Sequence, residues 1–371
     1  MSAERTYLQA FVHAWLEEIA PLSYADLAAR QEPPFASVPF GAAGVAYALL
    51  RAGRALGDEA IVARGQAWAG DALRFARTKQ GLRLPGGADA EVAPSLAYGA
   101  GGVRHVALLL ARARGDAAEM SRLVGGLVRS SRRAGGRSDE FLFGRAGHLA
   151  SSLLLFEATG DRRLRALAAE QAGPLLGRPR ARARPAWTRD ANLSFAHGRA
   201  GVAHALLGWH RAEGLEPPAW LIDELVRLAR ESVAWGRERQ RAPRAAVLTR
   251  SWCNGAAGLT LLWARAYEQT GDARFRRLAQ AGARRGVTAA AEAGGDLCCG
   301  LAGRAYAALA AERVAPGAGH REDAVALAVR AVDQMQGRWP NGLLKGYPGV
   351  VCLAVDLAFE RAPRGFPFVE A

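Results

Sequence analysis

Apolar residues along the chain recur at helical spacing in two kinds of segment. In the first kind they cover nearly the whole helix surface, as in 255–264, which predicts a helix buried on most faces. In the second kind they recur every three or four residues beside a charged face, as in 218–230 and 272–281, which predicts an outer helix. No alternation of the β type competes with these patterns, so we predict an all-α protein.

A GxxG motif opens each of the strongly apolar helices. Seven copies occur, and their first glycines are 45 to 58 residues apart, the length of a helical pair with its loops. These glycines are Gly41, Gly99, Gly144, Gly198, Gly255, Gly300 and Gly346. With an opening outer helix near residues 3–19, the pattern predicts seven inner and seven outer helices. Since every inner helix needs covering and no capping repeat is evident, we expect a closed α/α toroid.

Gly-Asp pairs mark four of the junctions between an inner and an outer helix. Glycine can end one helix in the left-handed conformation, and the following aspartate can cap the next helix. The pairs are Gly57-Asp58, Gly115-Asp116, Gly160-Asp161 and Gly271-Asp272.

Length and composition predict how many domains the chain has and whether it is soluble. No linker rich in Pro, Gly or Ser divides the 371 residues, so we expect one toroid domain over 1–371. The chain is 50% hydrophobic, yet it has no run of about 18 uncharged apolar residues. Its first residues, Met-Ser-Ala-Glu-Arg, do not resemble a secretion leader, which predicts a soluble, cytoplasmic protein.

The net charge of +14 is carried almost wholly by arginine, because Lys79 and Lys345 are the only lysines. A solvated arginine-rich exterior explains this charge, and so does binding to an acidic peptide, a complex partner or a membrane surface. No stacking aromatic residues interleave with the basic ones as in a nucleic-acid groove, which argues against nucleic-acid binding.

Three of the four cysteines stand just before GxxG glycines of adjacent repeats. They are Cys253, Cys298 and Cys299, whereas Cys352 lies inside the last apolar helix and is expected in the core. If the inner helices converge on one end of the toroid, three thiolates meet there. Such soft ligands favour zinc and leave a fourth position for water or substrate. Three inert buried cysteines are the alternative.

His197 precedes the glycine of the fourth motif and therefore shares the register of the cysteines. An imidazole there could transfer protons close to a metal site, although a purely structural histidine is the alternative. His204 lies seven residues further on, deeper in the same helix, and we expect it to be structural.

The seven GxxG helices, together with Ala196-His197-Gly198, Trp252-Cys253-x-Gly255 and Cys298-Cys299-Gly300, resemble the lanthionine synthetase C-like (LanC-type) cyclase family over essentially the whole chain. The resemblance implies an α/α toroid with a zinc ion (Zn2+) at its central cavity. It implies addition of a peptide cysteine thiol to dehydroalanine or dehydrobutyrine, which forms lanthionine and methyllanthionine thioether rings. The implied substrate is a dehydrated precursor peptide, with a dehydratase as a candidate partner and peripheral membrane association through such a complex.

The resemblance also implies roles for residues. Cys253 and Cys298 match the two cysteine ligands of the family, and Cys299 stands where most members have histidine. Three thiolates would place more negative charge on zinc, so a fourth, substrate thiolate would be held less tightly and stay more nucleophilic. His197 matches the acid/base residue of the family.

Two further correspondences are inexact. The family has an acidic residue ahead of the third GxxG, and both Asp139 and Glu140 are candidates, since the offset favours Glu140 and the residue type favours Asp139. The arginine of the family sits four residues before the first zinc cysteine, whereas Arg250 sits three before Cys253.

Three other functions stay open. The same site could add glutathione or another free thiol to dehydroamino acids, or the chain could be a non-catalytic zinc-bearing scaffold that binds peptides. Toroids also host glycosidases, but no acidic pair shares the cysteine register.

Overall fold

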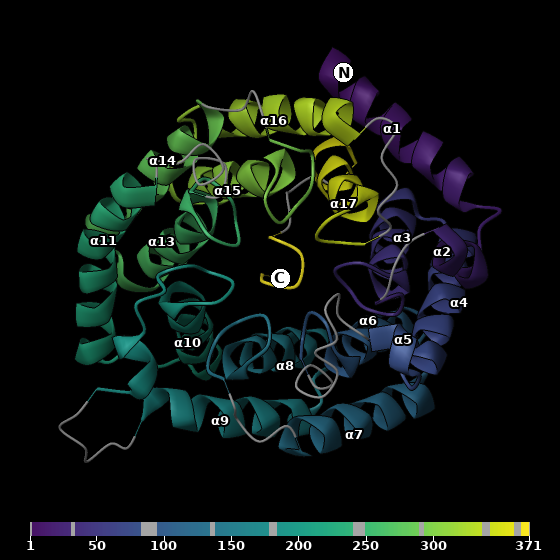
Figure 1. The fold of residues 1–371 in the computed structure, drawn as a ribbon, viewed down its shortest axis with the longest axis horizontal. Coiled ribbons are helices and arrows are strands. Elements are labelled where there is room, and N and C mark those ends of the chain that lie inside the picture. Colours follow the sequence, from purple (N-terminus) through teal and green to yellow (C-terminus); the bar gives the residue numbers. More distant parts are fainter. Residues whose placement is uncertain are drawn as a thin grey trace.

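Two concentric rings of helices form the protein in the computed structural model (Figure 1). The structure describes residues 2–30, 34–82, 95–133, 138–177, 184–239, 249–288, 293–335, 342–359 and 365–370, and no strand occurs among them. The inner ring consists of α3 (Ala42–Leu56), α6 (Ala100–Ala113), α8 (Arg145–Thr159), α10 (Arg199–Glu213), α13 (Ala256–Thr270), α15 (Leu301–Val314) and α17 (Tyr347–Ala358). The outer ring consists of α1 (Ala3–Ile19), α4 (Glu59–Phe75), α7 (Ala117–Arg133), α9 (Arg162–Leu176), α11 (Ala219–Arg239), α14 (Ala273–Val287) and α16 (His320–Met335).

Three short helical segments lie in the connections between these long helices. They are α2 (Tyr24–Arg30), α5 (Lys79–Leu82) and the 3-10 helix η1 (Ala186–Arg189). The predicted all-α toroid with seven inner and seven outer helices is therefore confirmed for the described residues. That all 371 residues form one domain stays a prediction.

The Gly-Asp junctions have the expected geometry. Gly57, Gly115, Gly160 and Gly271 all adopt φ between 66° and 71°, where a side chain would be strained. The aspartate after each glycine accepts a hydrogen bond from a backbone N–H in the first turn of the next outer helix, for example from Arg274 to Asp272 at 2.8 Å. Each pair thus ends an inner helix and begins an outer one within two residues.

The ring closes where the last inner helix meets the first. Helix α17 packs between α3 and α15, and α1 covers it from outside. A buried ion pair joins Arg51 of α3 to Asp356 of α17, and the Tyr306 hydroxyl of α15 donates to the same carboxylate at 2.7 Å. Because these groups are removed from water, losing one partner would leave an uncompensated buried charge. This network specifies the closed ring.

The GxxG glycines allow the loops and inner helices to approach closely. A Cβ atom on Gly255 would lie 2.2 Å from the Thr249 backbone. A Cβ atom on Gly258 would lie 2.1 Å from the Trp252 carbonyl and 2.6 Å from the Cβ of Phe195 in the preceding repeat. Since any side chain would clash, the motif recurs in every repeat.

Residues 365–370 occupy the centre of the ring, where the label C stands in Figure 1. The Phe366 ring stacks on Trp252 with centroids 4.7 Å apart, and Glu370 is buried and accepts a hydrogen bond from Arg313 at 2.9 Å. This segment fills the lumen directly behind the loop that carries Cys253.

Two sequence predictions on core residues are confirmed by burial, since neither Cys352 nor His204 is exposed. None of the described helices is long and apolar enough to cross a membrane.

Three histidines buried in inner helices predict acid sensitivity. Burial lowers the pKa of His105 to about 3 and that of His148 and His204 to about 4, so the folded protein keeps them neutral. As the pH falls below about 6.5, the unfolded chain binds protons at these sites and the folded protein does not. We therefore expect the free energy of unfolding to fall between pH 6.5 and 4, by roughly 3 kcal/mol for each histidine.

Urea unfolding at pH 7.5, 6.5 and 5.5 measures this effect. Glu370 contributes in a lower window. Burial alone would raise its pKa, but Arg313, His204 and Arg265 outweigh burial and lower it, so its stabilising contribution is complete above the ordinary pKa of 4.5 and is lost as the pH falls below that value. The Cys253→Ala variant serves as a control that removes any pH-dependent metal contribution. Equal stability of that variant at all three pH values would contradict the prediction.

Candidate metal and proton-transfer site

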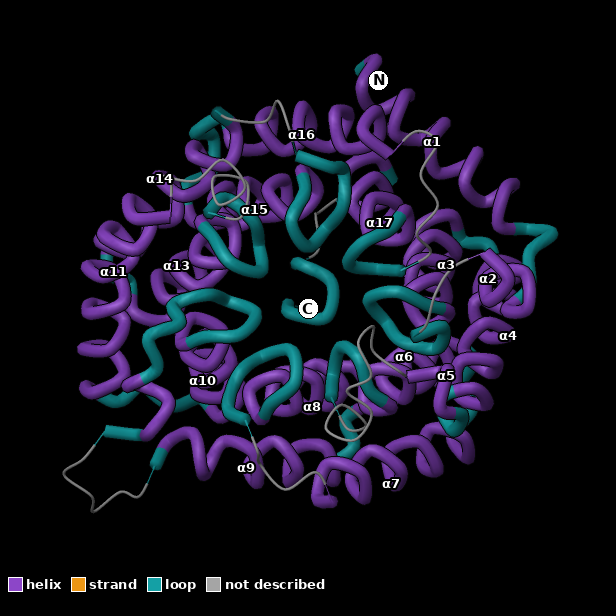
Figure 2. The backbone as a smooth tube through the Cα atoms, viewed as in Figure 1, coloured by secondary structure: helices purple, strands orange, loops and turns teal. Residues whose placement is uncertain are grey.

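Backbone hydrogen bonds link the loops that precede neighbouring inner helices, and Figure 2 shows these loops converging on the centre. The linked residue lies two positions before the first glycine of each motif. Leu142 donates to Ala196 at 3.1 Å, Ala196 to Cys253 at 3.0 Å, Cys253 to Cys298 at 3.3 Å and Cys298 to Leu344 at 2.9 Å. This continuous chain of contacts brings residues of distant repeats to equivalent positions.

A side chain four positions before the glycine fixes the turn in six of the seven loops, whereas the last loop has Gly342 at this position. The side chain accepts a hydrogen bond from the backbone N–H of the residue that immediately precedes the glycine, as in an Asx- or Ser-type turn. The accepting residues are Ser37, Ser95, Glu140, Ser194, Ser251 and Asp296. These six loops therefore owe their shape to backbone groups and this one side chain.

The residues immediately before the first glycines occupy equivalent positions in the seven loops, and several of them contact one another or the cysteines. In chain order these residues are Phe40, Tyr98, Phe143, His197, Asn254, Cys299 and Lys345. Neighbouring rings of the first four are in contact, with centroid distances of 5.8, 4.9 and 5.6 Å. Burial raises the pKa of Tyr98, and the negative charge of Cys298 adds to the shift, so this aromatic row lies near the cysteines.

The three predicted metal ligands lie together. The Sγ atoms of Cys253, Cys298 and Cys299 are all within 4.8 Å of one another, with Cys299 3.4 Å from Cys253 and 3.5 Å from Cys298. Sulfurs around tetrahedral zinc, with Zn–S bonds of about 2.3 Å, are about 3.8 Å apart. The three sulfurs could hold a metal ion, and their number, softness and separation fit zinc.

The charges of the three thiols are coupled. Hydrogen bonds from Cys298 and Cys299 lower the pKa of Cys253 to about 3, and the resulting thiolate raises the pKa of the other two. The three thiols therefore ionise as one coupled group, and a metal cation would favour ionisation of all three.

Lys345 places a cation in direct contact with this cluster. Its Nζ donates to the Cys299 Sγ at 2.9 Å and lies 3.7 Å from Oδ1 of Asp296. Burial would lower the pKa of Lys345, but the charges of Cys298, Asp296 and Cys299 outweigh burial and raise it. The sequence analysis missed this residue, although its position before Gly346 repeats the register of His197 and Cys299.

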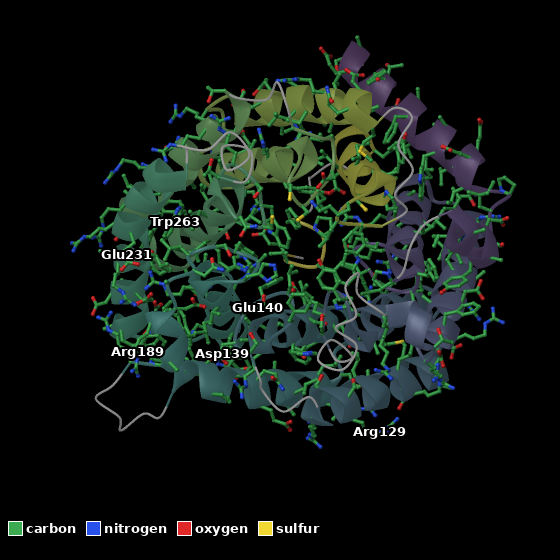
Figure 3. The ribbon with its side chains drawn as sticks, viewed as in Figure 1. Arg129, Asp139, Glu140, Arg189, Glu231 and Trp263 are labelled. Carbon is green, nitrogen blue, oxygen red and sulfur yellow. The ribbon has the colours of Figure 1, made fainter. Side chains whose placement is uncertain are left out.

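The acidic partner of His197 is Glu140. The His197 Nδ1 lies 2.8 Å from Oε2 of Glu140, and because a carboxylate only accepts, Nδ1 carries the proton. Asp139 instead forms an ion pair with Arg145 at 2.6 Å, and Figure 3 shows Glu140 nearer the centre of the ring than Asp139. A cavity of about 430 Å³ lies beside the His197–Glu140 pair. Of the two sequence candidates, the geometry brings Glu140 to His197.

Arg250 lies in the loop that leads to Cys253, close to the buried Arg304 of α15. Burial lowers the pKa of Arg304 to about 10, and the charge of Arg250 adds to the shift. Arg250 therefore belongs to the cationic surroundings of the site, and a catalytic role for it stays a prediction.

Comparison with known proteins places the chain in a family. A model of lanthionine synthetase C-like proteins matches residues 36–371. The chain belongs to the lanthionine synthetase C-like family. Among solved structures, nisin cyclase is similar with a TM-score of 0.61 and 14% sequence identity, over 95% of this chain and 93% of that chain. At this identity the likeness shows the toroid fold alone. No curated protein sequence matches the chain.

The structure brings several of the predicted site residues together. The cysteines and His197, which the sequence singled out by their register, occupy one end of the toroid. The same end carries Glu140 and Lys345, so this family member combines a three-sulfur cluster with a histidine–carboxylate pair and a lysine.

Proposed function

We propose that the protein is a zinc-dependent lanthipeptide cyclase that adds cysteine thiols of a dehydrated precursor peptide to dehydroalanine or dehydrobutyrine. The observation that carries the proposal is the cluster of Cys253, Cys298 and Cys299 at the end of the toroid that also carries the His197–Glu140 pair. The cysteines would hold Zn2+ through three thiolates. The ion, when bound, supplies the positive charge that ionises a substrate thiol at neutral pH.

His197 supplies the proton of the reaction. When the sulfur bonds to the β-carbon, the π electrons of the carbon–carbon double bond move onto the α-carbon and its carbonyl. The α-carbon must then gain one proton. Because Nδ1 of His197 keeps its proton toward Glu140, Nε2 is the ring nitrogen left to transfer protons: it can take up the proton that the substrate thiol releases and then deliver it to the α-carbon. Glu140 fixes the tautomer and the orientation of the imidazole and stabilises its cationic form.

The aromatic row of Phe40, Tyr98 and Phe143 supplies the remaining wall of the site. Its half-buried rings limit water around the reacting carbons and offer an apolar surface to the peptide. A dehydratase partner, peripheral membrane association through a complex, and a cytoplasmic location stay predictions.

A cyclisation assay tests the proposal. A dehydrated peptide with one cysteine and one dehydroalanine is incubated with the zinc-loaded protein, and the remaining thiols are then alkylated. Because ring closure leaves the peptide mass unchanged, the cyclised peptide resists alkylation while the open peptide gains the mass of the alkylating group. We expect zinc-dependent loss of alkylation, with chelator-stripped protein as the control.

Two outcomes would replace the proposal by an alternative. Growth of the peptide mass only when glutathione is added would indicate a free-thiol transferase. Peptide binding without turnover by the zinc-loaded protein would indicate a scaffold.

A further inference from the structure

Lys345 has contacts that the structure of its loop does not require. The equivalent positions in the first three repeats carry Phe40, Tyr98 and Phe143, so the loop forms without a cation there. The turn that carries Cys299 is fixed by Asp296, which accepts the Cys299 N–H at 2.8 Å. The loop of Lys345 has Gly342 in place of a capping side chain, and backbone hydrogen bonds join it to its neighbours, from Leu343 to Val38 at 2.9 Å and from Cys298 to Leu344 at 2.9 Å. These bonds do not use the ammonium group.

The charges of the site give this ammonium a function. Three thiolates around a divalent cation carry a net charge of −1, and an anionic fourth ligand would raise it to −2. The Nζ of Lys345 lies 2.9 Å from one of the three sulfurs, and its side chain is 34% exposed, so solvent screens the charge only in part. Asp296 Oδ1, 3.7 Å away, helps to hold the ammonium at this place.

We propose that Lys345 balances the negative charge of the three-thiolate site and so allows it to bind an anionic fourth ligand, the thiolate class of substrate. This inference rests on the proposed zinc site. Lys345 acts through the cysteine sulfurs and is thus a positioning residue. A hydrogen bond donated to Cys299 also withdraws charge from that sulfur, which leaves the metal a better acceptor for the incoming thiolate.

Cobalt-substituted protein tests the inference by a spectroscopic readout that is independent of turnover. Binding of 2-mercaptoethanol as a fourth ligand is followed through the sulfur-to-cobalt absorption, and binding of imidazole provides the matched neutral ligand. We expect Lys345→Met to bind one cobalt per chain and to bind the thiol at least about tenfold more weakly than the wild type. Its affinity for imidazole should change by less than about threefold, since that ligand adds no charge.

Two variants complete the design. Lys345→Arg keeps the charge and should restore thiol affinity to within about threefold of the wild type. Lys79→Met removes the same unit of net charge at the other lysine of the chain and should leave both affinities unchanged.

Several results would overturn the inference. Equal thiol affinity in Lys345→Met and the wild type would exclude charge balance by Lys345. A parallel loss of thiol and imidazole binding would assign the lysine a purely structural role. Wild-type protein that takes up no metal would instead overturn the proposed zinc site, and the inference with it.

Discussion

Alanine at position 253 should leave a folded protein without tightly bound zinc and without cyclase activity. Cys253 is the sulfur that both Cys298 and Cys299 approach, and its removal leaves only two ligands. Two thiolates bind zinc far more weakly than three, because each ligand contributes to a large total binding free energy of about 10–16 kcal/mol in structural sites. Elemental analysis should give one zinc per wild-type chain and almost none in the variant, and the alkylation assay should show no ring closure.

Cys352→Ala is the matched control for this prediction. The same substitution is made in α17, where Cys352 is fully buried and lies outside the three-sulfur cluster. This variant should lose some stability through a small cavity but keep its zinc and its activity. A Cys253→Ala protein that retains stoichiometric zinc would refute the three-cysteine site.

Replacing His197 with alanine should lower kcat by roughly 10²–10⁴-fold while the zinc content stays at the wild-type level. Glu140 orients the imidazole, and without the imidazole protonation of the α-carbon depends on water. Single-turnover cyclisation measures the chemical step, and elemental analysis of the same sample shows whether the metal site is intact.

Two carboxylate variants separate the candidates that the sequence left open. Glu140→Gln should lower kcat, because a neutral amide stabilises the cationic imidazole less well, whereas Asp139→Asn should act almost as the wild type since Asp139 pairs with Arg145. A larger loss in Asp139→Asn than in Glu140→Gln would reverse the assignment. Full activity of His197→Ala would remove the histidine from the mechanism.

The sequence predicted the toroid because close approach leaves a periodic signature. A glycine is required wherever an inner helix meets the preceding loop, so the GxxG motif recurs and reveals both the repeat and its register. The cysteines and His197 could be found because they share that register. Lys345 shares it too, and the criterion that found His197 would also have found the lysine.

Other features of the site depend on geometry that sequence spacing does not contain. The choice between Glu140 and Asp139 depends on which side chain folds back onto its own loop. Glu140 does so and accepts a hydrogen bond from the Phe143 N–H, whereas the adjacent Asp139 pairs with Arg145. The position of residues 365–370 in the lumen results from contacts with distant repeats, such as that between Phe366 and Trp252. No pattern in the local sequence indicates these contacts.

In these loops the groups that form the turn are separate from the side chain just before the glycine, and this separation has an evolutionary consequence. Backbone hydrogen bonds and, in six of the seven loops, a side chain four positions before the glycine form the loops, so the turn uses only the backbone N–H of the residue just before the glycine and not its side chain. Aromatic rings, an imidazole, an amide, a thiol and an amine all occupy that position in this one chain. Single substitutions at these seven places can therefore exchange metal ligands, proton carriers and binding surfaces while the toroid is inherited unchanged.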